Sequence, residues 1–130
     1  MKHNLIIEKR KIIVTAQVQG ISEFGSIDLI LDTGASKTVI NEDVIRLLGF
    51  DLYRLQPGNR LMTAGGGVSS KILKLPKFSL FGKDLSNFEV SVLKLPPQIT
   101  YYVDGLIGTD FLLKFQSIRF DFEAKTIETT

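Results

Sequence analysis

Apolar runs of strand length dominate the chain, and apolar and polar positions alternate within several of them. The first clear run is residues 11–20, which is rich in β-branched side chains and alternates in its second half. Gly20 starts a turn, and residues 24–31 return as a second predicted strand that ends directly before Asp32. The pattern indicates a hairpin whose second strand delivers a carboxylate at its end.

Further short runs follow along the whole chain. Extended or strand segments are predicted at residues 38–40, 60–64, 68–75, 78–81, 88–93, 117–122 and 126–129. Gly65-Gly66-Gly67 is the predicted tip of a hairpin, and Pro76 is expected to interrupt a strand. Pro96-Pro97 is expected to open an irregular loop.

Two short helices complete the predicted elements. Asn41 can cap the first, with Glu42 and Asp43 in its first turn and Gly49 as its stop. Thr109 can cap the second. Many short strands with two small helices predict an all-β fold, a small closed or nearly closed barrel.

Composition fits one soluble globular domain over residues 1–130. Hydrophobic residues make up 44% of the chain and charged residues 23%. The formal net charge is only +2, and the basic residues are scattered apart from Lys9-Arg10-Lys11, so no nucleic-acid partner is expected. Cysteine is absent and His3 is the only histidine, so we expect no disulfide, no metal site and no cofactor, and we assign His3 to the surface.

The apolar run near the N-terminus, Leu5-Ile6-Ile7, is broken by residues 8–11. It is too short for the core of a signal peptide or for a membrane span. No membrane partner is therefore expected, and a cytoplasmic location is the default expectation.

Asp32 is the leading candidate for chemistry. An apolar strand followed by Asp32-Thr33-Gly34-Ala35-Ser36 can hold a carboxylate rigidly in a dry environment. The same residues could form only a strand end and an Asp-initiated turn, in which Asp and Gly are common. The motif alone does not separate these interpretations.

The order of three segments favours the catalytic interpretation. Asp-Thr-Gly is followed by the glycine-tipped hairpin at residues 64–68, and then by Gly105-Leu106-Ile107-Gly108 and the predicted helix at Thr109. In this order, over about residues 12–127, the chain resembles the retropepsin-like aspartic proteases, and specifically their cellular and bacterial branch.

The resemblance implies a role for each segment. Asp32 would be the catalytic carboxylate of an endopeptidase acting on peptides or proteins, and Thr33 would brace the active-site loops across a dimer axis. Gly34, with Ala35 and Ser36, would complete the loop beside the substrate. The flap over the substrate would consist of Ala64, Gly65, Gly66, Gly67 and Val68. The segment packed beneath the loop would be Leu106, Ile107 and Gly108.

One Asp-Thr-Gly implies a homodimer. Aspartic peptidases need two carboxylates that share a proton, and this chain carries one such motif and no Asp-Ser-Gly. Two chains must therefore each contribute Asp32. Asp104 and Asp110 could be partners within one chain, but they fit a turn residue and a helix-start residue better. The C-terminal strands at residues 117–122 and 126–129 are the candidates for the dimer contact.

Two residues of this chain depart from the retroviral pattern. Retroviral relatives have an acidic residue and an arginine where this chain has Ser36 and Thr109, so the local brace of the loop must differ.

A catalytically inactive dimer of this fold that binds extended peptides is the alternative function. Candidates for lining a substrate cleft are Leu31, Val39, Met62, Val68 and Ile107.

Overall fold

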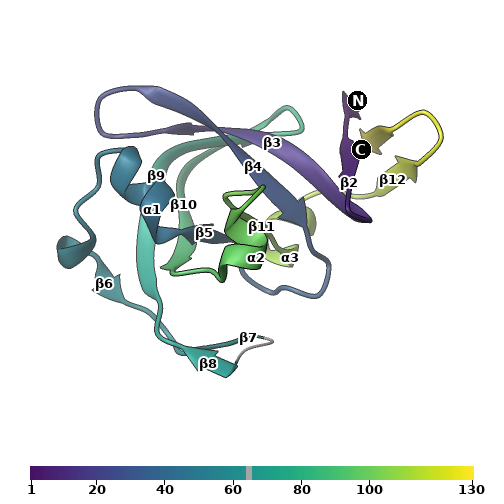
Figure 1. Ribbon diagram of the computed structural model, residues 1–130. Helices are drawn as coiled ribbons and strands as arrows, with labels where there is room; N and C mark the ends of the chain where they lie inside the picture. The colour runs from purple at the N-terminus through teal and green to yellow at the C-terminus, as the bar shows by residue number, and fades with distance from the viewer. Residues whose placement is uncertain (64–65) are drawn as a thin grey trace.

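The computed structural model describes residues 1–63 and 66–130, and strands dominate it (Figure 1). Six of them form a closed barrel in which each strand pairs with the next. In spatial order they are β3 (Lys11–Gln19), β4 (Phe24–Leu31), β11 (Gly105–Ile107), β5 (Val39–Asn41), β10 (Lys83–Leu93) and β9 (Lys71–Leu80). Pairing of β3 with β9, through Gln17 with Ser79 and Val18 with Phe78, closes the barrel. The predicted all-β barrel is confirmed.

Short elements surround the barrel. The sheet is extended at its two ends by β2 (Ile6–Glu8) and β6 (Gln56–Pro57). A separate three-stranded sheet has the order β1 (Lys2–Asn4), β13 (Thr126–Thr129) and β12 (Ile118–Asp121). A small hairpin, β7 (Leu61–Thr63) with β8 (Gly66–Val68), projects from the barrel. The short helices are α1 (Glu42–Leu47), η1 (Leu52–Arg54), α2 (Pro97–Thr100) and α3 (Thr109–Leu112).

The barrel interior is the main hydrophobic core. Strand alternation points one face of each strand inward, so Val14, Ala16 and Val18 of β3 are all buried there. Phe78 of β9 and Phe111 of α3 meet edge to face, with ring centroids 5.4 Å apart. The interior contact between β9 and α3 ties the helix to the barrel.

A second apolar layer lies on the other face of the sheet. Cross-strand pairing aligns Ile6, Ile13, Ile30, Leu106 and Val39 in one row across five strands. The segment containing α2 covers part of this row, and Ile13 and Ile30 are buried there. The sheet around residue 30 is therefore buried on both faces, which explains the nearly continuous apolar sequence before Asp32.

Pro76 does not interrupt its strand. β9 runs through it, and the β9–β10 pairing leaves out Pro76 and the opposite Asn87, whose φ is 55°. Proline is tolerated because an irregularity of this kind does not require its missing N–H. The expected irregular loop at Pro97 begins instead with the short helix α2, where proline occupies the first turn.

Two polar residues also differ from expectation. Asn41 stands before α1, but its side chain makes no cap; its Oδ1 accepts a hydrogen bond from the backbone N–H of Leu95 at 3.0 Å. His3 is half-buried, because β1 pairs with β13 and the His3 ring packs against Phe81 at 5.3 Å. The assignment of His3 to the surface is therefore wrong.

Helices long and apolar enough to cross a membrane do not occur among residues 1–63 and 66–130.

Candidate active site

Asp32 lies at the point where β4 leaves the barrel. Its backbone N–H donates to the carbonyl of Ile107 at 3.0 Å, which extends the pairing of β4 with β11 by one residue. The side chain is half-buried, and its Oδ1 accepts the backbone N–H of Gly34 at 2.8 Å. Ala35 N–H returns to the Asp32 carbonyl at 3.2 Å. The turn thus folds back on the carboxylate and fixes its direction.

The strand β11 holds this loop from beneath. It lies between β4, to which it is parallel, and β5, to which it is antiparallel, so the loop at residues 32–38 passes over its end. A Cβ on Gly105 would lie 2.0 Å from the carbonyl oxygen of Val39. A Cβ on Gly108 would lie 2.7 Å from the carbonyl oxygens of both Ala35 and Lys37. Glycine at 105 and 108 is therefore a steric requirement of the close packing of β11 against its neighbours.

Thr109 binds the loop directly. Its backbone N–H donates to the carbonyl of Ala35 at 2.8 Å, and its hydroxyl lies 3.3 Å from the same oxygen. The start of α3 is therefore fastened to the segment that carries Asp32. Ser36 is exposed, and Thr33 and Gly34 are exposed beside it.

The local brace is made by Thr38 and Asp110, a pair that the sequence analysis missed. The Thr38 N–H donates to Asp110 Oδ2 at 2.9 Å, and the Thr38 hydroxyl donates to Asp110 Oδ1 at 2.8 Å. Asp110 also accepts the N–H of Phe111 at 2.9 Å. A carboxylate and a hydroxyl thus tie the end of the loop to α3. A polar residue before an apolar strand was the available signal for Thr38.

Asp104 is likewise engaged away from Asp32. Its Oδ2 accepts the backbone N–H of Asp28 at 2.9 Å, and its backbone carbonyl accepts from Asn41 at 2.8 Å. Asp104 and Asp110 therefore hold the barrel together, and the structure assigns neither of them to a pair with Asp32.

The predicted flap falls on the hairpin β7–β8. Val68 pairs with Leu61, Gly67 with Met62 and Gly66 with Thr63. Gly66 and Gly67, expected at the tip, thus belong to the returning strand. Gly66 has a φ of 110°, which favours glycine, and a Cβ there would meet nothing within 4 Å.

Two residues of the predicted flap, Ala64 and Gly65, lie outside the described part of the chain. Arg60 lies along the hairpin, and its Nη2 donates to the carbonyl of Gly67 at 3.0 Å. Leu61 and Val68 pack against a buried cluster that contains Val39. The base of the hairpin is thereby attached to the strand that follows the loop of Asp32.

The candidate cleft residues divide into two groups. Ile107 is fully buried in the barrel core, so the interpretation that it lines a cleft is wrong. Val39 is 7% exposed and lies under Leu61 and Val68. Leu31 is half-buried at the end of β4. Leu31 and Val68 therefore remain the accessible candidates among the side chains that the structure describes.

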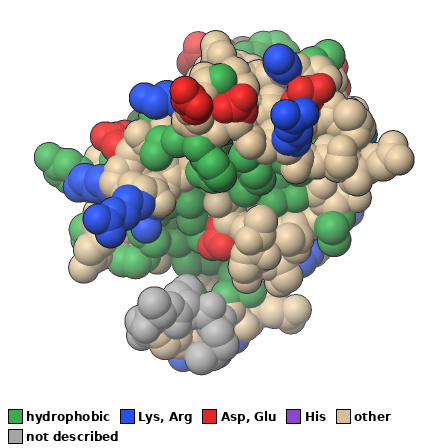
Figure 2. Space-filling model, turned by 90° about the vertical axis from the view of Figure 1, so that its right-hand side faces the viewer, with side chains coloured by type: hydrophobic (Ala, Val, Ile, Leu, Met, Phe, Trp, Pro, Cys, Tyr) green, Lys and Arg blue, Asp and Glu red, His purple; other side chains and the backbone are tan. Residues whose placement is uncertain are grey.

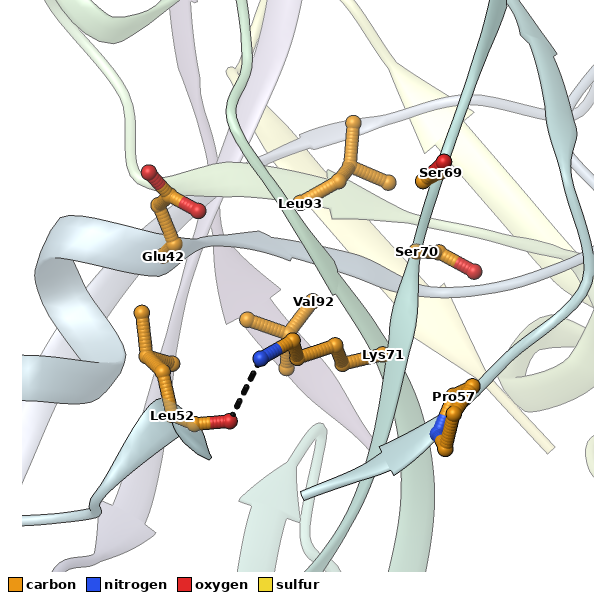
Figure 3. A pocket seen from close by; sticks show the side chains of 8 residues that line it. All are labelled: Glu42, Leu52, Pro57, Ser69, Ser70, Lys71, Val92 and Leu93. Atoms are coloured by element: carbon orange, nitrogen blue, oxygen red, sulfur yellow. Dashed lines mark hydrogen bonds between the residues drawn. The ribbon is translucent and has the colours of Figure 1, made fainter. Parts of the chain in front are cut away.

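A pocket of about 230 Å³ lies at the base of the hairpin, and none of its residues comes from the loop at 32–38 (Figure 3). It is lined by Glu42, Leu52, Pro57, Ser69, Ser70, Lys71, Val92 and Leu93. The Lys71 ammonium crosses it to the carbonyl oxygen of Leu52 at 2.8 Å, the dashed line in Figure 3. This pocket is part of the attachment of the hairpin and does not contain Asp32.

Within residues 1–63 and 66–130, no three His, Asp or Glu side chains lie close enough together to hold a metal ion.

Comparisons with known proteins agree with this arrangement. A sequence profile described as aspartyl protease matches residues 14–111, so the chain belongs to the aspartyl protease family. No curated protein sequence matches the chain.

Two solved structures share the fold. A retropepsin-like aspartic protease from Rickettsia conorii is 22% identical, with 99% of this chain and 89% of that chain covered and a TM-score of 0.73. The EIAV protease, solved in complex with the inhibitor HBY-793, is 18% identical, with 82% and 88% covered and a TM-score of 0.62. The retropepsin-like barrel predicted from the sequence is confirmed.

Proposed function

We propose that the chain is an aspartic endopeptidase that becomes active as a homodimer. The observation that carries this proposal is the half-buried carboxylate of Asp32, held by the N–H of Gly34 at the end of a barrel strand in a chain of the aspartyl protease family. Asp104 and Asp110 are both engaged in other hydrogen bonds. A second carboxylate for the site would therefore come from Asp32 of a second copy.

The chemistry follows from two carboxylates at short distance. Like charges so close cannot both ionise cheaply, so one of the two Asp32 side chains keeps a proton. The ionised carboxylate takes a proton from a water molecule as the water oxygen bonds to the scissile carbonyl carbon. The other carboxyl gives its proton to the carbonyl oxygen. The tetrahedral intermediate then collapses: the C–N bond breaks, the nitrogen takes the proton that the first carboxylate accepted from water, and a hydroxyl of the intermediate returns its proton to the second carboxylate as the new carboxylic acid forms.

Other residues of the loop would position the dyad and the substrate. Thr33 is exposed, which leaves its hydroxyl accessible to the corresponding loop of the second copy. Gly34 is also exposed, and without a side chain it would let the backbone of an extended peptide approach. The hairpin β7–β8 would cover the bound peptide as a flap.

The alternative is a dimer of the same fold that binds extended peptides and does not cleave them. A peptide can pair with strand edges without any carboxylate. The hydrogen bond from the N–H of Gly34 to Asp32 favours the peptidase, because binding alone does not require a carboxylate held in that direction.

The test compares Asp32→Asn with the unchanged protein on a peptide library at mildly acidic pH. Asn keeps the size of the side chain and its acceptor oxygen, but cannot serve as the ionised base, so we expect at least about a thousandfold loss of kcat/KM. Asp28→Asn is the matched control, because Asp28 lies on the same strand and accepts from the Thr15 hydroxyl at 2.7 Å. Equal activity of the unchanged protein and Asp32→Asn would refute the proposal.

A further inference from the structure

The pocket at the base of the hairpin β7–β8 has no role in the proposed function. Its volume of about 230 Å³ is several times the ~30 Å³ that one water molecule occupies in the liquid. An engineered apolar cavity of about 150 Å³ binds benzene, so this pocket has room for an organic molecule of about nine non-hydrogen atoms. Pockets for drug-sized ligands and cofactors are larger, about 300–1,000 Å³. The pocket therefore suits a small organic molecule.

This pocket lies apart from the loop that carries Asp32. In Figure 1, α1 and β6 are on the left of the molecule and the loop that follows β4 is on the right. Figure 2 looks onto that right-hand side, where a broad hydrophobic area is exposed. No residue of the loop at 32–38 lines the pocket. A molecule in the pocket therefore leaves the loop of Asp32 free.

One wall of the pocket carries a positive charge without an acidic partner. The Lys71 ammonium donates to the carbonyl oxygen of Leu52 at 2.8 Å and lies 5.5 Å from the ring centroid of Tyr53. It forms no ion pair with any carboxylate of residues 1–63 and 66–130. An ammonium group has three N–H donors, so the donors that Leu52 does not use are available to an anionic group in the pocket.

Another wall carries a negative charge that is weakly paired. Glu42 begins α1, and its Oε1 lies 3.6 Å from Nη2 of Arg46, while Nη1 of Arg46 binds Asp43 at 2.6 Å. The Glu42 side chain is 28% exposed, against 69% for Asp43. Glu42 and Lys71 both line the pocket but do not pair with each other within the described part of the chain. Two opposite charges thus line one cavity, each without a close partner of the other sign.

Apolar side chains form the wall between these charges. Leu52, Val92 and Leu93 line the pocket and are only 7%, 2% and 4% exposed. In Figure 3, Glu42 and Leu52 lie on one side of the pocket, and the Lys71 side chain reaches toward them from β9. A ligand with a charged end of each sign can therefore place an apolar group against buried aliphatic side chains.

We propose that this pocket binds a free α-amino acid with a branched aliphatic side chain, such as leucine. Its carboxylate binds the Lys71 ammonium, and its ammonium group binds the Glu42 carboxylate. Its side chain contacts Leu52, Val92 and Leu93, and its size matches the room in the pocket. A zwitterion satisfies both charges at once, which a simple acid or a simple amine cannot do.

Occupation of the pocket holds the base of the hairpin. The ligand joins Glu42 of α1 and Leu52 of η1 to Lys71 at the start of β9, only three residues after the end of β8. In the proposed function, on which this consequence rests, the hairpin is a flap that must open for each substrate. Bound leucine should therefore lower the peptidase kcat about twofold or more.

Titration of the isotope-labelled protein with leucine, followed by NMR, tests the site. We expect saturable shifts of the amide signals at Glu42, Leu52, Lys71 and Val92, with a dissociation constant of about 1 mM or lower. Isocaproate is leucine without the ammonium group, and isoamylamine is leucine without the carboxylate. Glycine keeps both charges without the side chain. Each of the three should bind at least about tenfold more weakly than leucine.

Two variants assign the charges. Lys71→Met should reduce leucine to the affinity of isoamylamine or below, while isoamylamine itself binds as it does to the unchanged protein. Glu42→Gln should do the same with leucine and isocaproate. The analogue that each variant still binds shows that its pocket is folded. Lys74→Met is the matched control, because Lys74 is exposed on the same strand and does not line the pocket, so leucine affinity should stay unchanged.

The outcomes separate this inference from the proposed function. Absence of saturable shifts up to about 50 mM leucine, or equal affinities for leucine, glycine and both analogues, would overturn the site. Asp32→Asn should bind leucine normally, so leucine binding by a protein that cleaves no peptide would support the pocket and contradict the peptidase. Cleavage that requires Asp32 but keeps its full rate at saturating leucine would leave the peptidase standing and refute control of the hairpin from this pocket.

Discussion

At the scale of single residues, the hydroxyl group of Thr38 makes two of the hydrogen bonds that attach the loop of Asp32 to the rest of the molecule. The Thr38 side chain is fully buried; it donates to Asp110 and accepts the N–H of Gly108 at 3.2 Å. Because the carboxylate also accepts the Thr38 N–H, the loop end, β11 and α3 share one polar cluster. A buried polar cluster of this kind is stable only while every member is satisfied.

Thr38→Val tests that cluster at nearly constant volume. The change removes the hydroxyl and leaves the N–H of Gly108 and one oxygen of Asp110 without that partner, which should lower the free energy of unfolding by about 1–3 kcal/mol. Urea denaturation measures the loss. The control is Thr15→Val. The Thr15 side chain is exposed and its hydroxyl donates to Asp28, so its loss should cost at most about 0.5 kcal/mol. Equal losses in the two variants would contradict a special role for Thr38.

Much of the Asp32 site could be predicted because its parts are local. The sequence shows an apolar strand, Asp-Thr-Gly and a later Gly-Leu-Ile-Gly. Glycine is required at 105 and 108 because a Cβ there would collide with neighbouring backbone atoms. The bond between Thr38 and Asp110 joins residues 72 positions apart. A polar residue before an apolar strand marks Thr38, but no local pattern identifies Asp110 as its partner. The continuation of β9 through Pro76 likewise depends on the irregularity opposite Asn87, which only strand pairing reveals.

At the scale of elements, Lys71 joins the base of the hairpin to the short helix η1. It begins β9, pairs with Pro57, donates to the carbonyl of Leu52 and lies 5.5 Å from the ring centroid of Tyr53. Nearby, the N–H of Gly58 donates to the carbonyl of Ser70 at 2.9 Å. These contacts fix where the hairpin leaves the barrel, so they set the position from which a flap would move.

Lys71→Met should loosen this attachment without removing the aliphatic stem. A hydrogen bond from a charged donor is lost, so we expect the free energy of unfolding to fall by about 1–2 kcal/mol, with faster amide exchange over residues 56–72. Lys74→Met is the control, because Lys74 is exposed on the same strand. If amide exchange over residues 56–72 is the same in both variants, Lys71 does not fix the hairpin.

At the scale of the whole molecule, the terminal sheet joins the two ends of the chain, and His3 lies in it. His3 pairs with the fully buried Ile127, and its Nε2 is buried without a hydrogen-bond partner among residues 1–63 and 66–130. Burial lowers the pKa of His3 from its ordinary value of 6.5, because the charged ring would lose its hydration. Protonation of His3 is therefore less favourable in the folded state than in the unfolded one.

Lowering the pH should therefore destabilise the folded protein through His3. As the pH falls below about 6.5, the unfolded chain takes up the proton first, so the free energy of unfolding decreases until the folded protein is protonated as well. His3→Gln removes the titration, so its melting temperature should fall less than that of the unchanged protein between pH 7.5 and pH 5. Parallel pH profiles of the two proteins would show that His3 does not couple protonation to folding. A steeper profile in the unchanged protein would place part of its acid sensitivity in the terminal sheet.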